Sequence, residues 1–278
     1  MSKFLYRSYV AMGDSLTEGL GDTGFEENRH NKGWADRLAS LLAREAAFAG
    51  HAFDFANVAL RGSSSLHILT AQLERTLELK PDLVTIMTGA NDLSWLPWRK
   101  KAIDPLLRGA LVRLYDVGAH VVLINTVRPA HTTLAKLMIG RSRQMSNLIE
   151  RIGAEFGAPV VDVHSMREFE RLDFWASDLV HFSSNGHVRV TNQVAEELGL
   201  TCRDETANVA GKTRLGPLSF FSWLGHDVIP FWSRKVRGVT SGFGREPKHD
   251  LFLRMIDPLA AAAHAANEAD VPSVPVAV

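Results

Sequence analysis

Cysteine is almost absent from this chain, in which Cys202 is the only one among 278 residues. A single thiol cannot form an intrachain disulfide, and it cannot supply a thiolate cluster for a metal. Such sparse use of cysteine fits a reducing compartment. The sequence therefore predicts a fold held together by its core, with no thiolate metal cluster, and a cytoplasmic location.

Long apolar runs and an excess of one charge are missing as well. No stretch approaches the roughly 20 apolar residues that span a bilayer. The N-terminus, MSKFLYRSYVAMGDS, has no apolar segment followed by a small-residue cleavage site, so we expect no signal peptide. Lys plus Arg and Asp plus Glu both number 31, and this balance argues against a general nucleic-acid binder. We expect a soluble globular protein.

The sequence does contain a regular alternation of short apolar runs and helical patterns up to about residue 200. The runs predict strands at 8–12, 53–58, 83–88, 120–125 and 159–163. The stretches between and after them predict helices at 34–48, 64–79, 104–117, 142–156 and 185–198. Apolar runs without alternation are typical of strands buried on both faces. This order predicts an α/β fold with a parallel, roughly five-stranded sheet between two layers of helices.

The chain changes character after residue 200. We expect one domain over 1–200 and an extension over 201–278 that is partly helical and ends in a disordered segment. The extension contains an aromatic and basic stretch over 218–238. Pro230 would break a continuous amphipathic helix there, which favours packing against the domain. A lid and a weak contact with a membrane surface are the alternatives.

Residues with reactive or hydrogen-bonding groups follow the predicted strands. Ser15 follows the first strand, Gly62 the second and Asn91 the third, while Asp178 and His181 stand just before the last helix. In a parallel sheet the loops at the carboxyl ends of the strands share one edge, where ligands bind. We therefore expect these five residues to lie close together.

Their chemistry is that of acyl transfer. A serine hydroxyl becomes nucleophilic when an imidazole takes its proton, and a carboxylate orients that imidazole. Ser15, His181 and Asp178 are the candidates for these roles. The oxyanion of the tetrahedral intermediate needs fixed N–H donors. The candidates for the oxyanion hole are the backbone N–H groups of Ser15 and Gly62 and the side-chain amide of Asn91.

Together these segments resemble a known family. The motifs Gly-Asp-Ser-Leu at 13–16, Gly62, Gly-Ala-Asn-Asp at 89–92 and Asp-x-x-His at 178–181 resemble those of the GDSL, or SGNH-hydrolase, esterases and lipases. The resemblance covers roughly residues 6–200. It implies a flavodoxin-like three-layer α/β/α sandwich, no metal or cofactor, and hydrolysis of a small-molecule or lipid ester through an acyl-enzyme. The extension resembles the tails of some actinobacterial members.

A second motif, GxGxxG at residues 19–24, is typical of dinucleotide-binding loops. Those glycines directly follow the first strand and open the first helix. Here Gly19 comes seven residues after Met12, and the helical pattern begins only at Trp34. The motif therefore favours a surface loop. A flavin or nucleotide binder and a non-catalytic binding protein on the same scaffold are the alternatives to an esterase.

Several neighbouring residues are alternatives within the site. His187 is the alternative base and Asp173 the alternative acid, but neither belongs to an Asp-x-x-His pair. Serines 63–65 are favoured as helix N-cap residues. The loop 126–140 and residues 95–98 would either line an acyl or alcohol pocket or pack the edge of the domain. Short-chain esters, lysophospholipids, acyl thioesters and acetylated sugars all fit these residues.

Overall fold

The computed structural model describes residues 6–22, 32–94, 100–128, 138–206 and 244–255 of the chain. Six strands form one sheet in the order β5-β4-β3-β1-β2-β6. They are β1 (Ser8–Met12), β2 (Phe53–Asn57), β3 (Leu83–Met87), β4 (His120–Ile124), β5 (Val160–Val161) and β6 (His249–Met255). All pairs are parallel except β2 with β6.

The central strand explains why the apolar runs do not alternate. On β1, Val10 lies opposite Ala56 of β2 and Val84 of β3, so both edges of β1 are paired. Tyr9 and Ala11 pack into one core cluster, whereas Val10 and Met12 belong to the other. Apolar side chains are therefore required on both faces of the strand.

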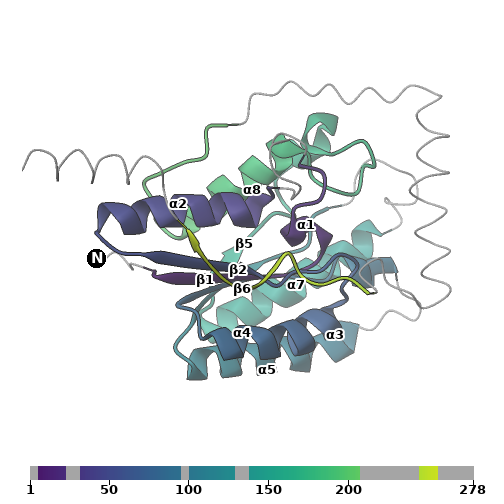
Figure 1. The fold of residues 1–278 in the computed structure, drawn as a ribbon. Coiled ribbons are helices and arrows are strands. Elements are labelled where there is room, and N and C mark those ends of the chain that lie inside the picture. The colour runs from purple at the N-terminus through teal and green to yellow at the C-terminus, as the bar shows by residue number, and fades with distance from the viewer. Residues whose placement is uncertain (1–5, 23–31, 95–99, 129–137, 207–243, 256–278) are drawn as a thin grey trace, which may run out of the picture.

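Helices cover both faces of this sheet (Figure 1). One layer holds α2 (Trp34–Phe48) and α8 (Ser184–Glu197), and the other holds α4 (Leu73–Leu79), α5 (Lys100–Asp116) and α7 (Ile139–Phe156). The arrangement confirms the predicted three-layer α/β/α fold. Among the described residues, no helix combines the length and apolar character that crossing a bilayer requires.

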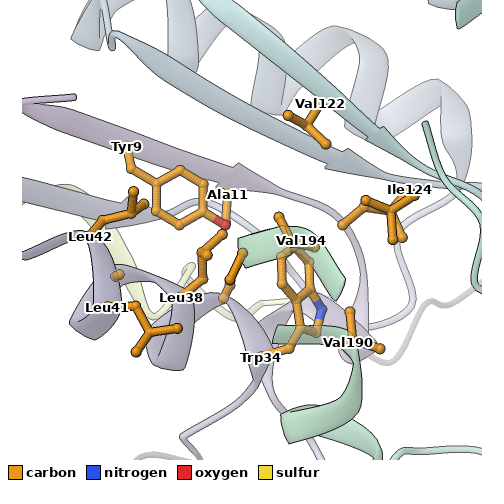
Figure 2. Close-up of a cluster of buried hydrophobic side chains, with 14 of the residues drawn as sticks. Tyr9, Ala11, Trp34, Leu38, Leu41, Leu42, Val122, Ile124, Val190 and Val194 are labelled. Atoms are coloured by element: carbon orange, nitrogen blue, oxygen red, sulfur yellow. The ribbon is translucent and has the colours of Figure 1, made fainter. Parts of the chain in front are cut away.

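The core on the α2 and α8 side is built around two large aromatic residues (Figure 2). Trp34 and Tyr9 are both fully buried, and Leu38, Val190 and Val194 pack in the same cluster. The Tyr9 hydroxyl is hydrogen-bonded to Thr85 Oγ1 at 2.8 Å, so its polar group is satisfied inside the core. Burial of each such apolar side chain contributes roughly 1.5–3 kcal/mol to folding.

A short helix that the sequence analysis missed follows β1 directly. Helix α1 (Ser15–Glu18) begins 19 residues before the first helix expected, that at Trp34. The Asp14 side chain caps it by accepting the N–H of Leu16 at 3.0 Å. A four-residue helix is too short to give a periodic apolar pattern. Only its N-cap residue, Asp14, could have indicated it from the sequence.

The helix expected over 64–79 is interrupted. It consists of α3 (Ser65–His67), a π-helical turn (Ile68–Gln72) and α4. Ser64 is the N-cap residue, as expected for one of the three serines, and its side chain accepts the N–H of His67. The π turn changes which side chains face the sheet in the middle of this helical segment.

Other helix boundaries differ from those expected. Helix α5 begins at Lys100, although the sequence placed its start at residue 104, next to Pro105. Pro105 therefore lies inside this helix, where it has no backbone N–H to donate. Gly157 takes a left-handed φ of 68° and caps the C-terminus of α7.

The described part of the extension contains a strand and no helix. Strand β6 pairs antiparallel with β2, with Phe53 opposite Met255 and Phe55 opposite Leu253, so the sheet has six strands instead of roughly five. Its partner lies about 200 residues earlier, and a local pattern does not reveal such a pairing. The segment 218–238 lies outside the described residues, and the domain boundary at 200 stays a prediction.

A buried ion network attaches the start of the extension to the domain. The Arg37 guanidinium on α2 contacts Asp22 at 2.7 Å and Asp204 at 2.8 Å, and the Arg37 side chain is 2% exposed. The Ser184 hydroxyl donates to the other oxygen of Asp22 at 2.5 Å. Residue 204 is therefore held against α2, and its backbone is also hydrogen-bonded to Asn192 of α8.

Candidate active site

Ser15 is the first residue of α1, at the point where β1 leaves the sheet. We call residues 13–19 the Ser15 loop. A side chain at Gly13 would lie 2.2 Å from Thr17 Oγ1, so only glycine fits beneath this helix. Asp14 is buried, whereas Ser15 itself is half-buried. The tight turn thus starts the helix at Ser15 without covering its side chain.

Gln72 holds the Ser15 loop from the opposite layer of helices. Its Oε1 accepts the N–H of Gly13 at 2.9 Å, and its Nε2 donates to the Gly13 carbonyl at 2.9 Å. The sequence pattern does not predict a role for Gln72 in the site. Gln72 is a buried polar residue between Leu69 and Leu73, on an otherwise apolar face of the helix. A polar residue at such a position needs hydrogen-bond partners, and this was the one sign in the sequence that Gln72 has a specific role.

Asn91 joins the loops that follow β1, β2 and β3. It begins a 3₁₀ turn (Asn91–Ser94), and its Nδ2 donates to Asp14 Oδ2 and to the Ser63 carbonyl, each at 3.1 Å. Both hydrogens of the amide therefore have acceptors. Gly89 takes a φ of 102°, in the left-handed region, and allows the turn that brings Asn91 to the Ser15 loop.

Asp92 connects the loop that follows β3 to the segment that follows β2. Its Oδ2 accepts both the N–H and the hydroxyl of Ser65 at 2.8 Å. The Thr88 hydroxyl donates to Ser65 Oγ at 2.9 Å. Ser65 is therefore a buried link between loops, not a helix cap.

Gly62 stands in a loop that is tied to α1. Its φ is 77°, which strongly favours glycine. The preceding Arg61 donates its backbone N–H to Glu18 Oε2 at 2.7 Å and its Nε to Glu18 Oε1 at 2.8 Å. Glu18 is the last residue of α1, so the ion pair sets the position of the Gly62 loop relative to that helix.

Asp178 and His181 form a hydrogen-bonded pair. We call residues 176–183 the His181 loop. His181 Nδ1 lies 2.5 Å from Asp178 Oδ2, while Asp178 Oδ1 accepts the N–H groups of Val180 and His181 at 2.9 Å. Burial alone would raise the pKa of the Asp178 carboxyl, but these hydrogen bonds and the nearby imidazole lower the pKa to about 2. The carboxylate is ionised at neutral pH, so Nδ1 carries the proton.

The turn after α1 packs directly on the His181 loop. Gly21 has a φ of 91°, and a side chain there would lie 2.3 Å from the Phe182 carbonyl and 3.1 Å from His181 Cβ. Among the described residues, the Ser15 hydroxyl and the His181 imidazole are not hydrogen-bonded to each other. Catalytic hydrogen bonds are often long in ligand-free enzymes and tighten when substrate binds.

Asp14 differs from Asp178 in its electrostatics. Burial raises the pKa of the Asp14 carboxyl to about 6, although the N–H of Leu16 and the His181 ring oppose this change. The hydrogen bonds described for the Asp14 carboxyl come from one backbone N–H and from the neutral Asn91 amide, and neither donor is a cation. Its oxygens serve as acceptors that shape the loop.

The alternative residues are engaged elsewhere. His187 is fully buried in α8, where its Nδ1 accepts the N–H of Trp34 at 3.1 Å and its Nε2 donates to the Leu20 carbonyl at 3.0 Å. Burial lowers the pKa of His187 to about 4, so the ring is neutral. Asp173 pairs with Arg171 at 2.7 Å.

The glycine-rich motif is not arranged as a nucleotide-binding loop. The first helix begins at Ser15, before the glycines, and Gly19 is the residue that ends it, with a φ of 101°. Gly24 lies outside the described residues, as do 95–99 and 129–137, so the choice between a substrate pocket and packing of the domain edge stays open for these segments. No group of three or more His, Cys, Asp or Glu within the described ranges is placed to hold a metal ion.

A comparison with protein-family models identifies the family of the chain. The model of the GDSL-like Lipase/Acylhydrolase family matches residues 11–189. The chain belongs to the GDSL-like lipase/acylhydrolase family. The matched range includes Ser15, Gly62, Asn91 and the Asp178–His181 pair. This GDSL-like acylhydrolase is therefore an enzyme that hydrolyses acyl esters. No curated protein matches the chain.

Solved structures show the same fold as this GDSL-like acylhydrolase. The acetylxylan esterase Axe2 of Geobacillus stearothermophilus is 19% identical, with a TM-score of 0.58 over 72% of this chain and 97% of that one. The lipase/acylhydrolase of Enterococcus faecalis is 22% identical (TM-score 0.53, 69% and 95% covered). The psychrotrophic esterase EstA of Pseudoalteromonas sp. is 15% identical (TM-score 0.52, 69% and 97% covered).

Proposed function

We propose that this acylhydrolase cleaves carboxylic esters with Ser15 as nucleophile, His181 as general base and Asp178 as the carboxylate that orients the imidazole. The observation that carries the proposal is the 2.5 Å hydrogen bond between His181 Nδ1 and Asp178 Oδ2. Because Nδ1 carries the proton, Nε2 has a free lone pair. That nitrogen can accept the proton of a serine hydroxyl.

The reaction has two halves. In the first, Ser15 Oγ attacks the acyl carbonyl carbon while His181 Nε2 takes the hydroxyl proton. The tetrahedral intermediate collapses, the bond to the alcohol oxygen breaks, and the imidazolium returns the proton to that oxygen. In the second, His181 deprotonates a water that attacks the acyl-enzyme, and the carboxylic acid leaves as Ser15 regains its proton. Asp178 stays ionised and stabilises the imidazolium.

The oxyanion is expected to receive N–H groups from three loops. The backbone N–H of Ser15 lies in the first turn of α1, where N–H groups have no acceptor within the helix. The backbone N–H of Gly62 and the amide of Asn91 are the other donors. Both amide hydrogens of Asn91 already have acceptors, on Asp14 and Ser63. Asn91 therefore has to share or exchange one of them when the oxyanion forms.

The test is hydrolysis of p-nitrophenyl esters, from acetate to palmitate, by the full chain. We expect Ser15→Ala to lose about 10⁴-fold or more in kcat, as for a triad member. The matched control is Ser40→Ala, since Ser40 lies on α2 and donates only to the Asp36 carbonyl in the same helix. Full activity in Ser15→Ala would refute the proposal. The ester series also shows which acyl chain length the enzyme prefers, and so whether its substrate is a small-molecule or a lipid ester.

A further inference from the structure

The residue before β6 points inward from the edge of the sheet. Lys248 has a side chain that is only 7% exposed. Its Nζ donates to the Glu18 carbonyl at 3.2 Å and to Asp36 Oδ2 at 2.8 Å. A lysine from the C-terminal extension is thus buried against two helices that lie more than 200 residues earlier in the chain.

The two acceptors belong to the end of one helix and the start of the next. The Glu18 carbonyl is at the C-terminus of α1, where helical carbonyls lack intrahelical partners and favour a cation. Asp36 is in the first turn of α2, and its carboxylate also accepts the N–H of Gly33 at 3.1 Å. The Lys248 ammonium therefore bridges α1 and α2.

The junction that Lys248 bridges is tightly packed. A side chain at Gly33 would come within 2.3 Å of Gly19 Cα, so the backbones on either side of the junction are in contact. Gly19 itself ends α1 with a left-handed φ of 101°. Because α1 has only four residues, its C-terminal attachment also determines the position of Ser15 at its other end.

Glu18 extends the contact to the second loop of the site. While its carbonyl accepts Lys248 Nζ, its carboxylate binds the backbone N–H and the guanidinium of Arg61. Arg61 immediately precedes Gly62. One residue thus joins the buried lysine to both the Ser15 loop and the Gly62 loop.

We propose that Lys248 is a positioning residue for ester hydrolysis: the C-terminal strand β6 places its ammonium where it holds α1, and with it Ser15 and the Gly62 loop, in the reactive arrangement. The inference rests on the function proposed above. It assigns part of the extension a role in catalysis, although Lys248 touches no reacting atom.

Two rates in the full chain test this role: phosphonylation of Ser15 by a fluorophosphonate, and kcat for p-nitrophenyl acetate. Lys248→Met keeps most of the aliphatic stem and removes the ammonium. We expect both rates to fall by about 10- to 100-fold with KM nearly unchanged, since small misplacements of a nucleophile cost this much. The matched control is Arg254→Met, because Arg254 lies on β6, which directly follows Lys248, but forms an exposed ion pair with Asp54. It should keep the wild-type rates.

A second variant separates positioning from loss of stability. Lys248→Met leaves the carboxylate of Asp36 without its ammonium partner, and this alone can lower the melting temperature. Lys248→Met with Asp36→Asn removes that charge and keeps an oxygen for the Gly33 N–H. We expect the double variant to regain melting temperature and to stay slow. Wild-type rates in the stabilised double variant would overturn the role.

The outcomes distinguish the two proposals. If the wild-type protein is not phosphonylated at Ser15, the proposed function fails and this inference fails with it. If the wild-type protein is phosphonylated and Lys248→Met reacts at the same rate, only the positioning role is wrong. Slow phosphonylation in Lys248→Met and normal phosphonylation in Arg254→Met would support it.

Discussion

The Ser15 loop and the His181 loop each carry an aspartate, but the two carboxyl groups differ strongly in pKa. Burial raises the pKa of Asp14 to about 6, whereas hydrogen bonds from the His181 ring and two backbone N–H groups lower the pKa of Asp178 to about 2. Asp14 instead faces one backbone N–H and one neutral amide. Two residues of the same type, Asp14 and Asp178, thus lie in different electrostatic environments.

Under the proposed mechanism, this difference in pKa suits the two residues to different tasks. A carboxylate that stabilises an imidazolium has to stay ionised throughout the reaction, which fits Asp178. Asp14 caps α1 and holds the Asn91 amide, and these contacts need acceptor oxygens more than a full negative charge. In the proposed mechanism, the aspartate of the His181 loop supplies negative charge, and the aspartate of the Ser15 loop holds neighbouring groups in position.

The largest expected effect comes from exchanging each aspartate for asparagine. Asp178→Asn removes the charge and favours the wrong imidazole tautomer, so kcat should fall by about 10⁴-fold at neutral pH. Asp14→Asn keeps one oxygen for the Leu16 N–H and loses only the contact with Asn91, so we expect about a tenfold loss. Steady-state kinetics on p-nitrophenyl acetate measures both. An equal loss in the two variants would contradict the assignment.

Asn91→Ala is expected to have the next largest effect. Removing one oxyanion donor should lower kcat by about 10²- to 10³-fold, with little change in KM. The variant also frees the Asp14 carboxyl from its amide partner, so circular dichroism should accompany the kinetics to verify folding. A normal kcat in a folded Asn91→Ala would remove this residue from the oxyanion hole.

A smaller effect concerns the pH dependence of folding. The pKa of Asp14 rises from 3.8 to about 6 on folding, so protonation favours the native state. Its contribution is fully present below about pH 4 and is lost as the pH rises through 6, a change of about 3 kcal/mol in the free energy of unfolding. Urea unfolding of the wild type and of Asp14→Asn at a series of pH values measures this contribution, because the asparagine side chain does not titrate.

The contribution of His187 to stability changes with pH in the opposite direction over the same range. The pKa of its ring falls from 6.5 to about 4 on folding, so its contribution is present above pH 6.5 and is lost as the pH falls through 4. The two terms largely cancel in the wild-type protein. Asp14→Asn should therefore lose stability toward acid more steeply than the wild type does. Parallel curves for the two proteins would contradict the raised pKa of Asp14.

The residues that sequence predicts best are those whose geometry is local. Asp178 and His181 are three residues apart, so their hydrogen bond depends on a single turn with Leu179 at a φ of 56°. Ser15 and Asn91 directly follow buried strands, and the parallel sheet brings such positions to one edge. The parallel five-stranded core of the sheet follows from the same apolar runs.

The residues that sequence does not predict act across long separations. Gln72 reaches Gly13 over 59 residues, and the π turn that ends at Gln72 changes the helical face in a way that no 3.6-residue period reveals. Lys248 reaches Glu18 over 230 residues. Both contacts depend on side-chain placement in the packed fold, which is settled only once the layers are assembled.

The most direct test of the central claim is the site of phosphonylation. The full chain is treated with a fluorophosphonate, digested, and mapped by mass spectrometry. A Ser-His-Asp mechanism predicts one adduct on Ser15 that is absent from Ser15→Ala and much slower to form in His181→Ala. An adduct on another serine, or ester hydrolysis by a protein that forms no adduct, would contradict it.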